Sequence, residues 1–227
     1  MNSINKTARM AGFLYLIYMA THIISDVWRD SFIVLGDATA TVSNIMAHEG
    51  LFTITVVGDL LAAALFFLAA WALYVLLKPV NKNLALLFLL LNMGSVVIQC
   101  ASDLFLVASQ SVMNGPDYLN VFQVDQLQSL AMFFLDLREK AFTVAWLFSG
   151  AWLFPLGYLV FKSGFLPKFL GVVLMVHCFT WVSTFFQSFL FPGFNAITYV
   201  SYPLGFIAEF GLTLWLLIMG AKEQKPA

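Results

Sequence analysis

The chain has 227 residues, of which 61% are hydrophobic and 16% aromatic, while only 10% are charged. A soluble globular domain carries about 25% charged residues, so this composition, with a mean hydropathy of +0.89, indicates an integral membrane protein with the lipid bilayer as its partner. The net charge is −1 and there is no basic arm, which argues against nucleic acid as a partner.

Six apolar segments are long enough to cross a membrane. A helix needs about 20 apolar residues to span a hydrocarbon core of about 30 Å. The segments are Ala11–Val27, Leu51–Leu77, Leu84–Val112, Ala141–Phe161, Phe165–Phe189 and Ile197–Met219. We therefore predict an all-α polytopic membrane protein, in which residues 1–227 form a single domain built as a bundle of six transmembrane helices.

Basic residues follow every second segment. The connections Lys78–Lys82 and Lys162–Lys168 are short and contain proline or glycine, which break helices. Together with Lys6, Arg9, Lys222 and Lys225 they place eight of the eleven Lys and Arg residues on one side. The positive-inside rule makes that side cytoplasmic, so both termini are predicted to be cytoplasmic.

The other connections are longer and less basic. Residues 25–49 carry Asp26, Asp30, Asp37 and Glu49 against Arg29 alone, and a second connection opens with the turn Asn114–Asp117, which includes Pro116. From Asp125 onward, apolar residues recur at three- and four-residue steps up to Leu137. This pattern predicts an additional interfacial helix before the fourth span, with a bend near the charged stretch Asp136–Lys140.

Polar side chains inside the spans gather in the outer half. At about 1.5 Å per residue from the basic turns, Asp59 lies near 28 Å, Asp103 near 31 Å, and Glu209 near 20 Å. Intramembrane charges are costly, so they are usually paired or turned toward a cavity. The residues predicted to line an outward-facing polar cavity are Asp59, Asp103, Arg138, Glu139, Glu209, His22, Gln99 and Gln187. The alternative is that they form interhelical pairs and bind no ligand.

The other motifs indicate no catalytic or cofactor chemistry. His48-Glu49 is followed by Phe52 where a second zinc ligand would stand, and no G-x-S-x-G or phosphate-binding glycine loop occurs, so no metal and no cofactor is expected. His177, counted near 13 Å, is interpreted as a hydrogen-bonded core residue. Cys100 and Cys178 are interpreted as reduced core residues. Pro203, close to Glu209, predicts a local widening of the sixth span.

Several short stretches resemble one family across nearly the whole chain. They are Lys6–Gly12, Gly36–Thr41 with Asn44-Ile45, Leu76–Lys82, Gly157–Leu159 with Lys162–Pro167, and Glu209 before Leu214–Leu217. These resemble a bacterial multi-pass membrane family, the domain of unknown function 4386 family. The resemblance implies a six-helix protein of the bacterial inner (cytoplasmic) membrane and supplies no reaction. This chain differs from the family pattern in having Thr53, Asn92 and Arg138 where arginine, arginine and histidine are common.

Three functional hypotheses follow. The leading one is a non-enzymatic membrane protein that binds or passes a small or amphiphilic ligand, such as a lipid, through the outward-facing polar cavity. The second is a membrane-embedded enzyme acting on a lipid or other hydrophobic substrate, with Asp59, Asp103 or Glu209 as acid or base. The third is a structural or partner-binding subunit, which full pairing of these carboxylates between helices would favour. The sequence does not fix the oligomeric state.

Overall fold

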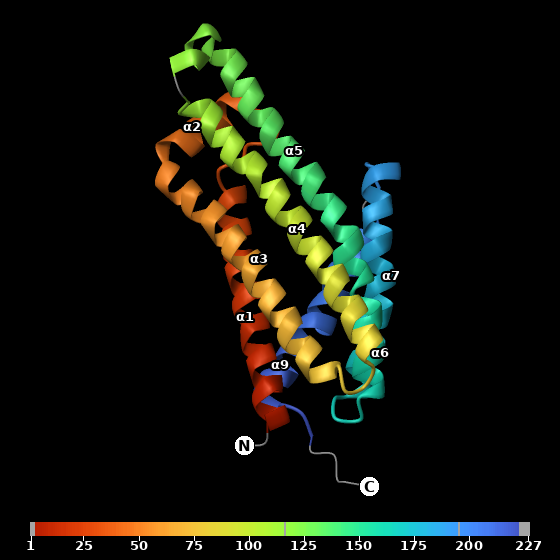
Figure 1. Cartoon of the computed structure of the whole chain (residues 1–227). Helices are drawn as coiled ribbons and strands as arrows, with labels where there is room; N and C mark the ends of the chain where they lie inside the picture. The colour runs from red at the N-terminus through yellow and green to blue at the C-terminus, as the bar shows by residue number, and fades with distance from the viewer. Residues whose placement is uncertain (1–2, 116, 195, 223–227) are drawn as a thin grey trace. The chain divides into compact units, whose positions relative to one another are not determined.

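A computed structural model describes residues 3–115, 117–194 and 196–222, and every regular element in these ranges is helical (Figure 1). The main helices are α1 (Ser3–Asp30), α2 (Ala38–Ala47), α3 (Glu49–Leu77), α4 (Lys82–Met113), α5 (Val124–Ala151), α6 (Leu153–Lys162), α7 (Lys168–Leu190), α8 (Ala196–Gly205) and α9 (Gly211–Leu214). Shorter turns are the 3₁₀ helix η1 (Asp117–Val121) and the π-helical turns η2 (Phe206–Phe210) and η3 (Trp215–Met219). Pro116 and Lys225, used in the sequence argument, lie outside the described residues.

Six helical stretches of the described residues have the length and apolarity of membrane spans. They are Ile4–Asp30, Glu49–Leu77, Lys82–Met113, Val124–Lys162, Lys168–Leu190 and Ala196–Met219. The prediction of an all-α protein with six transmembrane helices is confirmed. The cytoplasmic placement of the termini and the interfacial position of the residues before the fourth span stay predictions.

Several helix boundaries differ from the predicted segments. The first helix continues past Val27 to Asp30. Helix α5 runs without a break through Asp136–Lys140 and ends at Ala151, and the bend expected in that stretch stays a prediction. The charged stretch contains neither proline nor glycine. The break falls at Ala151 because the ring of Pro155 conflicts with the carbonyl four residues earlier and cannot donate to it.

The described chain divides into two compact units. Unit 1 comprises residues 1–18, 64–97 and 143–227, and unit 2 comprises residues 19–63 and 98–142. Helices α1, α3, α4 and α5 each contribute residues to both units. The single domain expected from the sequence stays a prediction, and each unit is described separately below.

The core of unit 1 is aromatic. Trp152, which is fully buried, packs edge-on against Phe66 with ring centroids 5.2 Å apart, and Tyr15 and Phe88 each lie 6.2 Å from it. Offset and edge-on arrangements of this kind are the favourable ones for aromatic rings. Trp152 therefore joins α1, α3 and α4 at the α5–α6 junction.

Glycines allow close helix contacts in unit 1. Helices α6 and α7 lie side by side (Figure 1). A Cβ atom on Gly157 would stand 2.7 Å from the carbonyl oxygen of Gly171 and 2.9 Å from the backbone nitrogen of Met175. Small residues at such a crossing let two membrane helices approach closely.

The two described ends of the chain also meet in unit 1. Asn5 Oδ1 accepts a hydrogen bond from the backbone N–H of Ala221 at 2.9 Å. Arg9 donates to the carbonyl of Ile218 at 3.4 Å. Because the basic ends of the first and last helices are in contact, both are held at the same end of unit 1.

Unit 2 has its own apolar core and a short helix that closes one side of it. Phe32, Phe52, Leu106 and Leu135 pack together with Ile45 of α2. Helix α2 begins at Asp37, whose carboxylate accepts the backbone N–H of Ala40 at 2.8 Å and caps the helix. The hydroxyl of Thr41 bonds both the N–H and the carbonyl of Val34, which fixes the turn between α1 and α2.

Candidate functional site

Buried charges in unit 2 meet where α1 and α3 approach closely. Gly58 on α3 has no side chain, and the hydroxyl of Ser25 on α1 occupies the space that a Cβ atom would need. This contact brings the next turn of α1 toward Asp59, the residue after Gly58. Arg29 consequently lies inside the unit, although the sequence pattern assigned it to the acidic connection at residues 25–49.

Arg29 is held by two carboxylates. Its Nη1 contacts Asp59 Oδ2 of α3, and its Nη2 contacts Asp26 Oδ1 three residues earlier on the same helix. The guanidinium is almost completely buried, whereas the side chain of Asp26 is 46% exposed. Sequence spacing offered one signal for this residue, because Asp26 and Arg29 are i, i+3 neighbours on a helix.

Arg138 on α5 is the second buried cation. Its Nε lies 3.3 Å from Asp103 Oδ1 on α4, and its Nη2 lies 3.6 Å from Asp59 Oδ2 on α3. Its Nη1 donates to Glu139 at 2.6 Å, and its guanidinium stacks 4.4 Å above the Phe142 ring. The planar guanidinium suits such multiple contacts. Arg138 therefore pairs with two of the carboxylates that were predicted with it to line the polar cavity.

The inner part of this cluster is electrically balanced. Four charged residues are nearly inaccessible, with exposed fractions of 1% for Arg29, 4% for Asp59, 2% for Asp103 and 1% for Arg138. Two positive and two negative side chains cancel, which offsets the cost of removing them from water. We call Arg29, Asp59, Asp103 and Arg138 the ionic cluster; it connects α1, α3, α4 and α5 within unit 2.

Three further predicted site residues lie beside the ionic cluster in the same unit. His22 Nδ1 is 3.7 Å from Asp59 Oδ1, and its ring faces Phe142 at 5.9 Å. Gln99 is buried, and its backbone carbonyl accepts a hydrogen bond from the hydroxyl of Ser102 at 2.7 Å. Glu139 is 59% exposed in its side chain and extends the charges to the surface.

The other two predicted site residues, Glu209 and Gln187, belong to unit 1. Glu209 accepts a hydrogen bond from the hydroxyl of Tyr15 and lies 3.4 Å from His177 Nε2. Gln187 donates to Thr198 at 2.9 Å and accepts the N–H of Ile197 at 3.0 Å, which fixes the start of α8. Glu209 and Gln187 thus contact different partners within unit 1.

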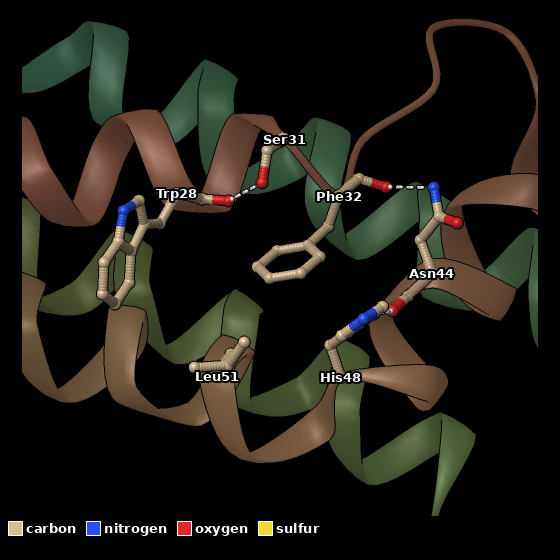
Figure 2. A pocket seen from close by; sticks show the side chains of 6 residues that line it. All are labelled: Trp28, Ser31, Phe32, Asn44, His48 and Leu51. Atoms are coloured by element: carbon tan, nitrogen blue, oxygen red, sulfur yellow. Dashed lines mark hydrogen bonds between the residues drawn. The ribbon is translucent and has the colours of Figure 1, made fainter.

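A pocket of about 450 Å³ opens in unit 2 between α1, α2 and α3. We call it the aromatic pocket; its lining residues are Trp28, Ser31, Phe32, Asn44, His48 and Leu51. Figure 2 shows the ring of Phe32 between the side chains of Trp28 and His48. Trp28, one of the lining residues, directly precedes the buried Arg29 on α1.

Hydrogen bonds fix the polar wall of the aromatic pocket (Figure 2). The hydroxyl of Ser31 donates to the carbonyl of Trp28 at 2.6 Å, and the side-chain amide of Asn44 donates to the carbonyl of Phe32 at 3.3 Å. His48 Nδ1 is 3.1 Å from the carbonyl of Asn44. A carbonyl oxygen only accepts, so Nδ1 carries the hydrogen and the neutral ring presents Nε2 as an acceptor.

A second pocket in unit 2, of about 360 Å³, is acidic. We call it the acidic pocket; its lining residues are Asp30, Ile33, Leu35, Met132, Leu135, Asp136 and Glu139. Glu139 thus connects the predicted site to a cavity, while its neighbour Arg138 is buried in the ionic cluster. In the part of the chain that the structure describes, no three His, Cys, Asp or Glu residues are grouped as a metal site requires.

The helices and their buried charges define this chain as a multi-pass helical membrane protein. It belongs to the family described as Domain of unknown function (DUF4386), whose model matches residues 10–220. The chain is also 29% identical over 170 residues to an uncharacterized protein of Archaeoglobus fulgidus, which covers 74% of this chain and 85% of that protein. No solved structure matches. Because this relative is archaeal, the comparisons support a membrane location in general and not the bacterial inner membrane in particular.

Proposed function

We propose that this protein binds a small amphiphilic molecule in the aromatic pocket of unit 2. The observation that carries the proposal is the pocket itself, which has a volume of about 450 Å³. Its ring-bearing side chains are Trp28, Phe32 and His48, and its hydrogen-bonded polar side chains are Ser31, Asn44 and His48. Ligand sites of this size are typically apolar cavities with a few fixed polar groups. The aliphatic and aromatic walls take an apolar body, and the polar wall orients a head group.

The unused hydrogen-bonding capacity of the wall selects the head group. Ser31 has its hydroxyl hydrogen directed to Trp28 and retains lone pairs, and His48 retains the lone pair of Nε2. Both groups therefore accept from a ligand that donates. Among the residues that the structure describes, no aspartate, glutamate, lysine or arginine lines this pocket. A neutral hydroxyl, as in a long-chain alcohol or phenol, satisfies these acceptors without burying a charge.

The ionic cluster supplies a rigid support for the pocket. Arg29 follows Trp28 on α1, and its partner Asp59 fixes α1 against α3, which carries Leu51. Side chains on supported helices hold a ligand more accurately than side chains on loops. This also separates two roles that the sequence argument combined, since the buried carboxylates join helices while the ligand occupies a neighbouring cavity.

The pairing of those carboxylates favours a structural role for the ionic cluster. Asp59 and Asp103 are both engaged by Arg138, so neither is presented to a ligand in the way the predicted polar cavity required. An outward-facing opening of the aromatic pocket is part of the proposal and rests on the acidic character of residues 25–49 under the positive-inside rule.

The test compares three probes of equal chain length on the full-length protein in lipid nanodiscs. They are a long-chain phenol, the corresponding amine and the corresponding carboxylic acid, measured by thermal shift and by tryptophan fluorescence. The phenol is expected to bind at least about tenfold more tightly than the acid. His48→Phe keeps a ring but removes Nε2, so it should weaken phenol binding by about tenfold.

Two controls make the result specific. Asp136→Asn alters the acidic pocket and Glu209→Gln alters unit 1, and both should leave phenol binding unchanged. Equal binding of all three probes, or unchanged phenol binding by His48→Phe, would overturn the proposal. Tightest binding of the amine with loss in Asp136→Asn would instead assign ligand binding to the acidic pocket.

A further inference from the structure

Glu209 lies in the π-helical turn η2 and faces two other titratable side chains. The hydroxyl of Tyr15 on α1 donates to Glu209 Oε2, and His177 Nε2 on α7 lies 3.4 Å from Glu209 Oε1. Tyr15 is completely buried and His177 is 2% exposed, whereas the Glu209 side chain remains 23% accessible. The carboxyl group of Glu209 is thus partly accessible, whereas the imidazole of His177 and the phenol of Tyr15 that contact it are buried.

The hydrogen bonds around His177 determine where its proton lies. The hydroxyl of Thr180 donates to the carbonyl of His177 at 3.0 Å, and it accepts from Ser201 at 3.2 Å. Its oxygen also lies 3.2 Å from His177 Nδ1. Because the single hydroxyl hydrogen of Thr180 is directed to a carbonyl, Nδ1 must be the donor in this contact. His177 therefore carries a hydrogen on Nδ1.

This assignment leaves Nε2 opposite the carboxyl group of Glu209. A neutral Nδ1–H imidazole facing an ionised carboxylate would place a nitrogen lone pair against a negatively charged oxygen, which is repulsive. One proton shared between His177 Nε2 and Glu209 Oε1 removes the conflict. The pair is then either an imidazolium with a carboxylate or a neutral imidazole with a carboxylic acid. Both forms have zero net charge, which suits a membrane span.

The backbone is shaped to bring this pair together. A Cβ atom on Gly205 would stand 2.6 Å from His177 Nε2, so a larger residue at this position would displace the imidazole from its present place. Gly205 is four residues before Glu209, and Pro203 lies inside α8 just before it. The π-helical geometry at residues 206–210 widens the helix there, and such turns are frequent at functional sites.

We propose that Tyr15, His177 and Glu209 form a proton-binding site in the membrane-spanning part of unit 1. In its resting state the His177–Glu209 pair holds one shared proton. Binding of a second proton converts it to an imidazolium beside a neutral carboxylic acid, and the net charge rises from zero to +1. Glu209 receives that proton through its accessible edge, and the change in charge falls on the contact between α7 and the η2 turn.

The titratable side chains beside Tyr15, His177 and Glu209 are tyrosines and a cysteine. Tyr18 stacks on Tyr15 at 5.7 Å on the α1 side, and Tyr202 of α8 packs at 5.8 Å against Trp181. Cys178 follows His177 on α7 and is buried. None of these neighbouring titratable side chains in unit 1 is a carboxylate or a cation.

Nitrogen NMR of histidine tests the site directly. The full-length protein, labelled with ¹⁵N-histidine in nanodiscs, has three histidines, and His22→Asn and His48→Asn identify the His177 signals. Wild-type His177 should show a shared or second proton on Nε2, with one pH-dependent transition. In Glu209→Gln the ring should become a neutral Nδ1–H tautomer and that transition should disappear.

Tyr15→Phe keeps the ring and removes only the donor to the carboxylate. Loss of that donor changes the hydrogen bonding of the carboxylate, so the transition should shift from its wild-type position. This variant also keeps the test decisive if Glu209→Gln does not fold. The proposal is overturned if wild-type His177 is a simple neutral tautomer without a transition, or if Tyr15→Phe leaves the transition where it is. His48→Asn is expected to leave it unchanged.

Discussion

Arg29 and Arg138 form ion pairs with the same oxygen atom, Oδ2 of Asp59. The two arginines come from α1 and α5, and the shared carboxylate comes from α3. Asp59 is therefore the central anion of the ionic cluster, and each arginine has a further carboxylate partner of its own, Asp26 for Arg29 and Asp103 for Arg138.

Asp59→Asn should destabilise the protein strongly. The substitution leaves two buried guanidinium groups with one buried carboxylate between them, and breaking a buried ion pair costs about 3–5 kcal/mol. The measurement is the free energy of unfolding or the melting temperature in detergent. Asp26→Asn is the matched control, because that side chain is 46% exposed and its loss should cost less than about 1 kcal/mol. Equal effects of the two variants would contradict the central role of Asp59.

Part of the ionic cluster could be predicted from the sequence. Counting residues along each span placed Asp59 and Asp103 at similar depth, about 28 and 31 Å, and the structure brings both into contact with Arg138. Arg29 was missed because a charge two residues after an apolar run normally marks the end of a span. Its burial depends on a partner from another helix and on the absence of a side chain at Gly58, and neither can be read from a local pattern.

The contact between His177 and Glu209 was missed for a geometric reason. Depths counted at the α-helical rise gave about 13 Å for His177 and about 20 Å for Glu209. Two π-helical turns lie between residues 206 and 219, and a π-helical turn advances less per residue than an α-helical one. The count therefore placed Glu209 too far from the basic end. The proline at position 203 did indicate the region where the helix widens.

Asn92→Leu should stabilise the protein. Asn92 on α4 is completely buried, and neither atom of its side-chain amide has a hydrogen-bond partner within the described residues. An unsatisfied buried polar group costs about 1–3 kcal/mol, and leucine has the same branched arrangement of side-chain heavy atoms without that cost. Thermal unfolding of the purified protein measures the gain.

Asn83→Leu provides the comparison for this substitution on the same helix. Asn83 is exposed, so its replacement should change the free energy of unfolding by less than about 0.5 kcal/mol. A lower melting temperature for Asn92→Leu than for the wild type would show that the amide contributes an interaction that leucine cannot make.

Gly157→Ala should weaken the packing of α6 on α7. The added methyl group would stand 2.7 Å from one backbone oxygen and 2.9 Å from one backbone nitrogen, and backbone atoms cannot rotate away. Overpacking of this kind costs about 1–3 kcal/mol. Gly50→Ala is the matched control in α3, because no atom lies within 4 Å of the new methyl group. There the better helix propensity of alanine predicts unchanged or higher stability, and a melting temperature that falls equally in both variants would contradict the packing argument.

Asp37→Ala removes the cap of α2 and should weaken ligand binding in the aromatic pocket. Asp37 caps α2 through the N–H of Ala40, and α2 carries Asn44 while His48 follows its end, so loosening α2 disturbs two residues of the aromatic pocket. Loss of a cap costs about 1 kcal/mol, which corresponds to about fivefold weaker binding of the phenol probe if the pocket must be reordered on binding. Titration of tryptophan fluorescence in nanodiscs measures that affinity. Asp37→Asn retains a capping oxygen and should bind like the wild type, whereas phenol binding unaffected by Asp37→Ala would place the ligand away from α2.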